Sequence, residues 1–219
     1  MMTEAPDILA PEAELALAWS GEMVRAPLST ALQLDRRLAR IATRTQEIML
    51  GQMRLAWWRD ALARPLADRP RGDAVLDAIG AHWAGREAAL IAMVDGWEVL
   101  MTAERLGRAE AEAFAAQRGA FFVALWDDCP PAAAVRLVAA GLRWAAADAA
   151  SAVSDPQERD ALIAAGQARQ VPLGRVPRRL RGVAVLDALA RRALKRGGRP
   201  LMEGRGASLA AYKAAIFGF

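Results

Sequence analysis

Cysteine and histidine are nearly missing from this chain, which has only Cys129 and His82. One cysteine excludes a disulfide within the chain and a metal site built from several thiolates. One histidine excludes a metal site with two histidines and argues against a Ser–His–Asp triad. Any chemistry must therefore depend on carboxylates, arginines and apolar surface.

Strand-forming residues are also scarce. Aromatic residues make up 6% of the sequence, with a single tyrosine, and alanine supplies many of the 54% hydrophobic residues. Alanine is the best helix former, and Leu, Met, Arg, Glu and Gln follow it closely. We therefore expect an all-α protein. The 219 residues suit one domain, residues 1–219, with residues 1–10 as a flexible N-terminal segment.

The first residues do not show the basic residues and apolar run of a signal peptide. No stretch reaches the roughly 20 apolar residues that span a bilayer. We expect a cytoplasmic protein, with peripheral attachment to a membrane as an option.

Lysine is rare (Lys195 and Lys213), so arginine carries the net charge of +4. A GC-rich genome explains this most simply; a surface that binds phosphate is the functional alternative. No nucleic-acid-binding motif is visible, so we expect no nucleic-acid partner.

Prolines and glycines divide the chain into predicted helices. They cover about 11–19, 27–44, 49–64, 73–106 with a bend near residue 85, 109–126, 131–153, a stretch from 156, 180–195 and a last helix ending IFGF. Residues 20–27 (SGEMVRAP) and 166–179 are predicted loops. In SDPQE, Asp155 is expected to cap a helix whose first residue is Pro156, with Glu158 completing a capping box.

Two adjacent tryptophans mark the helix MLGQMRLAWWRD at 49–60. Neighbouring helical residues point about 100° apart, so Trp57 and Trp58 cannot face one partner. Two apolar stripes follow helical spacing. They are Leu50, Met53, Trp57, Ala61 and Leu55, Trp58, Leu62. We therefore expect a helix buried on two sides inside a bundle, with Arg54 and Arg59 reaching carboxylates on adjacent helices or the end of a cavity.

This helix carries a family resemblance. Met49–Leu62 resembles the P-x-L-G-x-I-R-L-x-W-W-R-x-A-L helix of the squalene/phytoene synthase family. The matching positions of interest are Arg54, Trp57, Trp58, Arg59 and Asp60. Residues 28–41, 90–101, 114–125 and 176–194 are similar, more weakly, to further family helices in the same order.

The resemblance implies an isoprenoid-synthase fold, in which antiparallel helices surround a central apolar cavity. Enzymes of the family join two prenyl diphosphates head to head. They use two D-x-x-x-D motifs on facing helices, because carboxylates at i and i+4 share one helix face. Two such pairs hold Mg²⁺ ions, which neutralise the diphosphate leaving group.

Neither motif is visible here. The first expected helix has only Asp35, beside Arg36, Arg37 and Arg40, and the second has only Asp148 among alanines. One D-x-x-x-D occurs, Asp73–Asp77, but at a helix start, where an N-cap with a first-turn acid is the simpler interpretation. Asp127–Asp128 is expected in a loop. Asp95 and Glu98 share a helix face and are expected to pair with Arg54 or Arg59.

Two hypotheses follow. The first is a catalytically inactive family member, an assembly or membrane-associated accessory protein similar to the complex I assembly factor of the family. Its cavity would hold an isoprenoid or lipid without a cofactor. Arg36, Arg37 and Arg40, with Arg44, are candidates for binding anionic headgroups or a protein partner, although they do not all share one face. The alternative is an active Mg²⁺-dependent prenyltransferase whose unusual metal site uses Asp95, Glu98 and Asp148.

Overall fold

The computed structural model describes residues 8–45, 47–169 and 171–218, and within these ranges the chain is all-α, without strands. None of the described helices is long and apolar enough to cross a lipid bilayer. The helices are α1 (Pro11–Ala18), α2 (Glu22–Arg44), α3 (Ile48–Ala63), α4 (Ala74–His82), α5 (Glu87–Thr102), α6 (Arg108–Arg118), α7 (Phe121–Ala124), α8 (Pro131–Ala152), α9 (Pro156–Ala168), α10 (Arg181–Lys195) and α11 (Gly206–Phe217).

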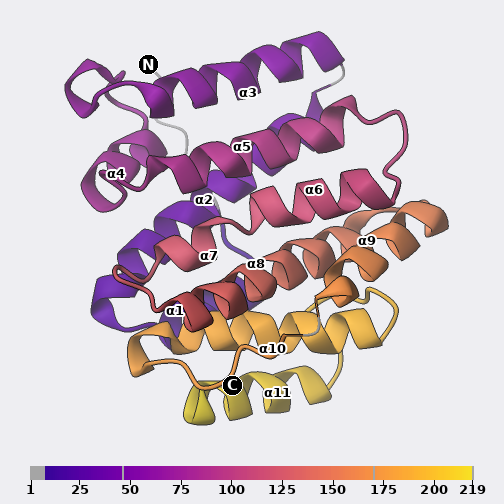
Figure 1. Ribbon diagram of the computed structural model, residues 1–219. Coiled ribbons are helices and arrows are strands. Elements are labelled where there is room, and N and C mark those ends of the chain that lie inside the picture. The colour runs from indigo at the N-terminus through magenta and orange to yellow at the C-terminus, as the bar shows by residue number, and fades with distance from the viewer. Residues whose placement is uncertain (1–7, 46, 170, 219) are drawn as a thin grey trace.

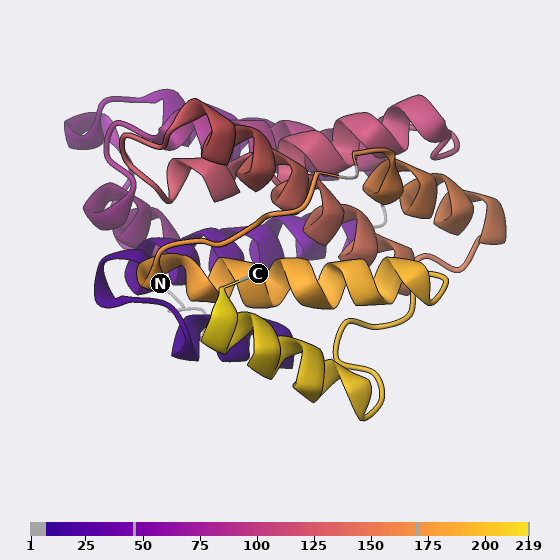
Figure 2. The same cartoon turned by 60° about the horizontal axis from the view of Figure 1, so that its bottom comes forward.

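The helices form a stack that largely follows chain order (Figure 1). α3 packs on α5, α5 on α6, α6 on α8, α8 on α10 and α10 on α11. α2 lies behind this stack and contacts α4 and α5, while α1 contacts α10. The turned view shows α11 lying outside α10 (Figure 2). α3 and α11 are therefore the two ends of the stack, and α6 and α8 lie near its middle.

The predicted loop at residues 20–27 is wrong for most of its length, because α2 already begins at Glu22. Pro27 lies inside the helix, where proline removes one hydrogen bond. Burial of Val24 and Pro27 offsets that loss. In addition, the Arg25 guanidinium donates to the carbonyls of Leu17 and Ser20 and ties the new helix to the end of α1.

Two predicted helices are interrupted at glycines. The stretch 73–106 divides into α4 and α5 around Gly85, whose φ of 80° favours glycine. The stretch 109–126 divides into α6 and α7 at Gly119. A Cβ at Gly119 would lie 2.2 Å from the carbonyl carbon of Gly141, so the end of α6 touches the backbone of α8 directly. This close approach brings Arg118, the last residue of α6, against α8.

The prediction that α3 is buried on two sides is wrong. The stripe of Leu55, Trp58 and Leu62 is buried, but most of the other stripe is exposed, including Met53 and Trp57. α3 packs mainly on α5, with a smaller contact to α2, and forms an end of the stack (Figure 1). Helical periodicity identified both stripes, but it could not show that only one of them has a neighbour.

The remaining predicted boundaries agree with the structure to within a few residues, except that α9 continues to Ala168, three residues into the predicted loop at 166–179. α8 ends at Ala152, and Asp155 caps α9 by accepting from the backbone N–H groups of Gln157 and Glu158. The Glu158 carboxylate accepts instead from the N–H of Leu106. Of the N-terminal segment 1–10, residues 1–7 lie outside the described part, and Leu9 is buried in the core.

Candidate functional site

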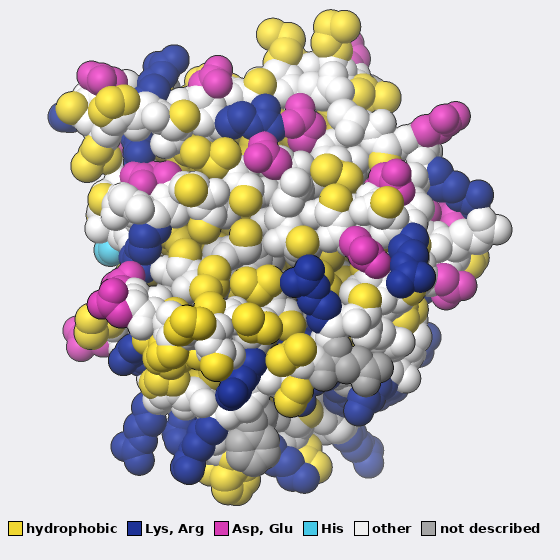
Figure 3. Space-filling model, in the orientation of Figure 1, with side chains coloured by type: hydrophobic (Ala, Val, Ile, Leu, Met, Phe, Trp, Pro, Cys, Tyr) yellow, Lys and Arg dark blue, Asp and Glu magenta, His cyan; other side chains and the backbone are white. Residues whose placement is uncertain are grey.

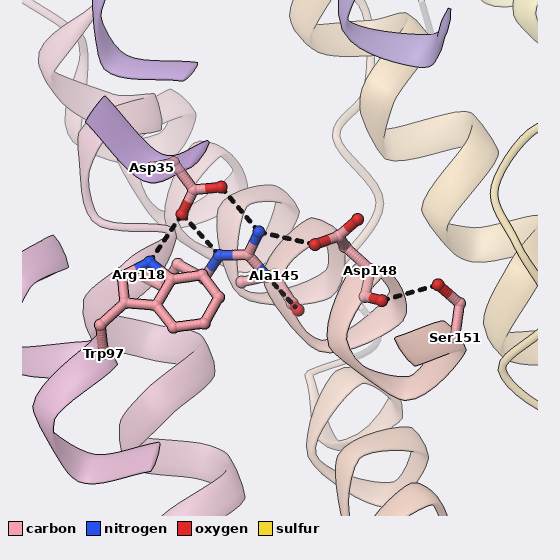
Figure 4. Close-up of polar contacts among 6 residues, drawn as sticks. All are labelled: Asp35, Trp97, Arg118, Ala145, Asp148 and Ser151. Carbon is pink, nitrogen blue, oxygen red and sulfur yellow. Dashed lines mark hydrogen bonds and ion pairs between the residues drawn. The ribbon is translucent and has the colours of Figure 1, made fainter. Parts of the chain in front are cut away.

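A buried arginine, Arg118, lies between Asp35 and Asp148, the isolated aspartates of α2 and α8 (Figure 4). Its Nε and Nη2 donate to the two carboxylate oxygens of Asp35 in α2, each at 2.7 Å. Nη2 also donates to Asp148 in α8, at 2.6 Å. The sequence separation is 83 residues to Asp35 and 30 residues to Asp148, so only the fold brings the three side chains together.

Further groups form hydrogen bonds with Arg118 and Asp35. Nη1 of Arg118 donates to the carbonyl of Ala145 at 3.2 Å, and the indole N–H of Trp97 donates to Asp35 at 2.9 Å (Figure 4). The guanidinium also lies 4.7 Å from the ring centroids of both Trp97 and Trp144, within cation–π range. Such a bidentate, stacked arrangement requires arginine and would not suit lysine.

Burial makes the electrostatics of the network strong. The side chains of Arg118 and Asp35 are each 3% exposed, whereas that of Asp148 is 34% exposed. Desolvation by burial lowers the pKa of Arg118, but the charges of Asp35 and Asp148 outweigh it and raise the pKa above its ordinary value. Arg118 therefore remains charged. Removing it would leave Asp35 as an unpaired buried charge, which is strongly unfavourable.

A fourth ionisable group, Glu12 of α1, lies at the rim of this network. Burial raises the pKa of Glu12, and the negative charge of Asp148 raises it further; a backbone hydrogen bond and Arg36 act in the opposite direction.

The cavity beside Arg118 has a volume of only about 30 Å³. Its lining includes Glu12, Asp35, Arg36, Arg118, Trp144 and Asp148. A water molecule needs about 10–15 Å³ of such space, so the cavity has room for a few water molecules at most and a prenyl chain does not fit there.

These residues do not suit the Mg²⁺ that the family resemblance implies. Magnesium prefers an octahedral set of oxygen ligands, with carboxylates free to bind it. Here both oxygens of Asp35 accept from Arg118, and one oxygen of Asp148 does so too. Within the described ranges, no group of three or more His, Cys, Asp and Glu side chains could hold a metal ion.

The candidate acids Asp95 and Glu98 belong to a separate network. Both accept from Arg59 of α3, with 2.7 Å between Arg59 Nε and Asp95. About a third of each side chain is exposed. Burial lowers the pKa of Arg59, while Glu98 and Asp95 raise it, with a net increase. The network holds α3 against α5, as the pairing with Arg59 predicts. Since Asp148 pairs with Arg118, the three candidate catalytic acids do not converge.

An open cleft of about 550 Å³ lies between α2 and α3. Its lining residues are Arg37, Arg40, Ile41, Arg44, Thr45, Arg54, Trp57, Trp58 and Asp73. Arg37 forms an ion pair with Asp73 and lies 5.9 Å from the ring centroid of Trp58. Asp73 also caps α4 by accepting from Val75 and Leu76, as expected from the sequence.

The structure separates the three candidate anion-binding residues. Arg37 and Arg40 line the cleft together with Arg44 and Arg54, whereas Arg36 lines the small cavity beside Arg118. Asp60 of the family-like helix is exposed on α3. Sequence analysis missed Arg118 altogether. The available signal was an arginine inside the apolar run FAAQRGAFF, directly before a glycine.

Asp127 and Asp128 lie in a turn after α7, outside both networks, as predicted for a loop.

Comparisons of this chain with models of protein families, with curated proteins and with solved structures found no match.

Proposed function

We propose that this chain is a catalytically inactive protein of the squalene/phytoene synthase type, which acts as an assembly or membrane-associated accessory protein similar to the complex I assembly factor of that family. The observation that carries the proposal is the position of Arg118 between Asp35 and Asp148. The resemblance of residues 49–62 to the family helix supplies the family context.

The chemical argument concerns charge. Ionising a prenyl diphosphate requires cations that stabilise the departing diphosphate, and losing one such positioned group costs several kcal/mol of transition-state stabilisation. The family places these cations between two carboxylate-rich helices. In this chain a guanidinium neutralises the remaining carboxylates. The arginine supplies the helix–helix attraction that metal ions would give, but it occupies both oxygens of Asp35 and one oxygen of Asp148, so the two acids are not free to bind a metal ion together.

The accessory role leaves room for an isoprenoid or lipid ligand and a protein partner. An isoprenoid would have to bind away from the 30 Å³ space beside Arg118. The cleft between α2 and α3 is large enough for a phosphorylated headgroup. If the complex I role holds, deletion of the gene will lower the amount of assembled complex I on native gels.

The alternative is an active Mg²⁺-dependent prenyltransferase that uses Asp95, Glu98 and Asp148. It requires these acids to approach one another, whereas Arg59 holds two of them and Arg118 holds the third. Substrate binding would therefore have to break both networks.

A calorimetric titration with farnesyl or geranylgeranyl diphosphate, with and without Mg²⁺, distinguishes the two. We expect no Mg²⁺-dependent binding and no release of diphosphate in a turnover assay. Release of diphosphate that disappears in Asp95→Asn and Asp148→Asn, but persists in the loop variant Asp128→Asn, would overturn the proposal and locate the metal site.

A further inference from the structure

The outward face of α3 exposes an unusual row of large apolar side chains. Met49, Met53 and Trp57 are 73%, 64% and 45% exposed and follow one another at intervals of four residues. Ile48 and Leu50 beside them are 61% and 40% exposed. Figure 3 shows apolar side chains projecting from the upper end of the molecule, where α3 lies. We call Met49, Leu50, Met53 and Trp57, which share one side of α3, the α3 apolar row; Ile48 is exposed at the start of the helix.

Positive charge borders the row on one side. Trp57 belongs both to the α3 apolar row and to the lining of the cleft between α2 and α3. Arg44 and Arg54 also line this cleft, are exposed, and make no ion pair with another residue in the described part of the chain. Asp73 is the only carboxylate among the lining residues described, and it pairs with Arg37. The cleft therefore carries an excess of positive charge.

We propose that the α3 apolar row and the adjoining arginine cleft form a docking surface for an anionic lipid bilayer. The inference deepens the proposed accessory role and rests on it for biological context. Met49, Met53 and their neighbours enter the acyl region, while Arg44 and Arg54 face the phosphates of the headgroups. Trp57 lies between them, at the depth that tryptophan prefers in membrane interfaces.

The arrangement favours a bilayer over other occupants. α3 lies at one end of the helix stack (Figure 1), and the side chains of the row are exposed there, so they are accessible to a lipid surface. The charge of the cleft complements anionic headgroups, and each basic residue near such a surface contributes about 1 kcal/mol of attraction. A second copy of the chain would instead present the same arginines, and like charges disfavour such contacts.

Flotation of the full chain with vesicles tests the proposal. We expect binding to phosphatidylcholine vesicles that contain phosphatidylglycerol and much weaker binding to phosphatidylcholine alone. The double substitution Arg44→Gln and Arg54→Gln should weaken binding about thirty-fold, from the loss of two basic residues. Met53→Glu should weaken it at least about tenfold, because a charge replaces a side chain that enters the acyl region.

Matched controls come from α11, at the other end of the stack. Leu209 is 56% exposed, close to the value for Met53, and Arg205 and Lys213 are exposed. Leu209→Glu matches Met53→Glu, and Arg205→Gln with Lys213→Gln matches the arginine pair. Neither control should change vesicle binding by more than about twofold, since both leave the α3 row and its cleft intact. Equal losses at both ends would overturn the proposed surface.

The location of Trp57 gives an independent measurement. Lipids with brominated acyl chains should quench tryptophan fluorescence in the wild-type protein, and Trp57→Phe should remove most of that quenching. No quenching, equal binding to neutral and anionic vesicles, or lipid-independent self-association that buries Trp57 would overturn the proposal. These results are independent of the diphosphate assays, so a failure here is separate from a failure of the catalytically inactive assignment.

Discussion

Charged residues lie on both faces of α2, but Asp35 on one face is buried whereas Arg44 on the other is exposed. On the inner face Asp35 pairs with Arg118, both almost completely buried. On the outer face the exposed Arg44 lines an open cleft that also receives the exposed Arg54. Burial fixes the inner charges to one another, whereas the outer arginines remain exposed to solvent and to whatever binds there.

The physical difference is the surrounding medium. In the interior, an ion pair compensates for lost hydration only if its geometry is good and its remaining donors find partners. The Arg118 network meets this condition through Ala145 and Trp97. At the surface, hydration and salt screen each charge, so stability gains little, but the charges stay available for recognition. The inner network therefore stabilises the fold, and the outer arginines are suited to binding.

Replacing Arg118 gives the strongest test of this contrast. Arg118→Gln leaves Asp35 buried without its partner, so the free energy of unfolding should fall by about 3–5 kcal/mol. Arg108→Gln on the same helix removes a largely exposed arginine that pairs with Glu112, and it should cost less than about 1 kcal/mol. Urea denaturation measures both. Equal losses in the two variants would contradict the contrast.

Removing Asp73 affects both the fold and the cleft. Asp73→Ala removes the cap of α4 and the partner of Arg37, so unfolding should become easier by about 1–2 kcal/mol. The same change removes a negative charge from the cleft and should strengthen binding to anionic vesicles. The nearby Asp77→Ala leaves the cleft lining unchanged and serves as the control. Weaker vesicle binding by Asp73→Ala would be inconsistent with the docking surface.

The contribution of Glu12 to stability depends on pH and gives a further test of the contrast between buried and exposed charges. Folding raises the pKa of Glu12 above its ordinary value of 4.5, mainly because the carboxyl group is buried. The protonated form is thus favoured in the folded state, so this contribution to stability is present at low pH and is lost as the pH rises through the raised pKa. Glu12→Gln should therefore stabilise the protein at pH 7 and have little effect well below pH 4.5. Thermal denaturation at both pH values measures this difference. Destabilisation at pH 7 would contradict it.

The smallest expected effect concerns the exposed arginines. Arg44→Gln with Arg54→Gln should change the free energy of unfolding by no more than about 0.5 kcal/mol, because neither residue pairs with another described residue. Urea denaturation again provides the measurement. A loss of several kcal/mol would mean that these arginines have a structural role, and the vesicle experiments would then need other variants.

Local sequence features predicted much of the helical framework. Proline at the first helical position located the start of α8, and Asp155 before Pro156 located the start of α9. Asp73 was recognised as a cap, and the pairing of Asp95 and Glu98 with Arg59 was one of two predicted options. These features depend on residues close in sequence, or on a helix face that periodicity defines.

The errors have a common physical origin. The start of α2 depends on burial of Pro27 and on hydrogen bonds from Arg25 to the carbonyls of Leu17 and Ser20 at the end of α1, which no local pattern shows. The exposure of Met53 depends on the position of α3 at the end of the stack. Arg118 looked like any other arginine, because its partners come from helices 30 and 83 residues away.

The sequence by itself determined that the chain is helical and where most helices begin and end. It also determined that neither D-x-x-x-D motif of the family that the chain resembles is present. These properties follow from residue type and short-range spacing. Only the tertiary structure decided that Arg118 joins Asp35 to Asp148 and that Arg44 and Arg54 meet the α3 apolar row at an open cleft. The reason is that burial and long-range pairing depend on which helices become neighbours, and helical periodicity does not specify those neighbours.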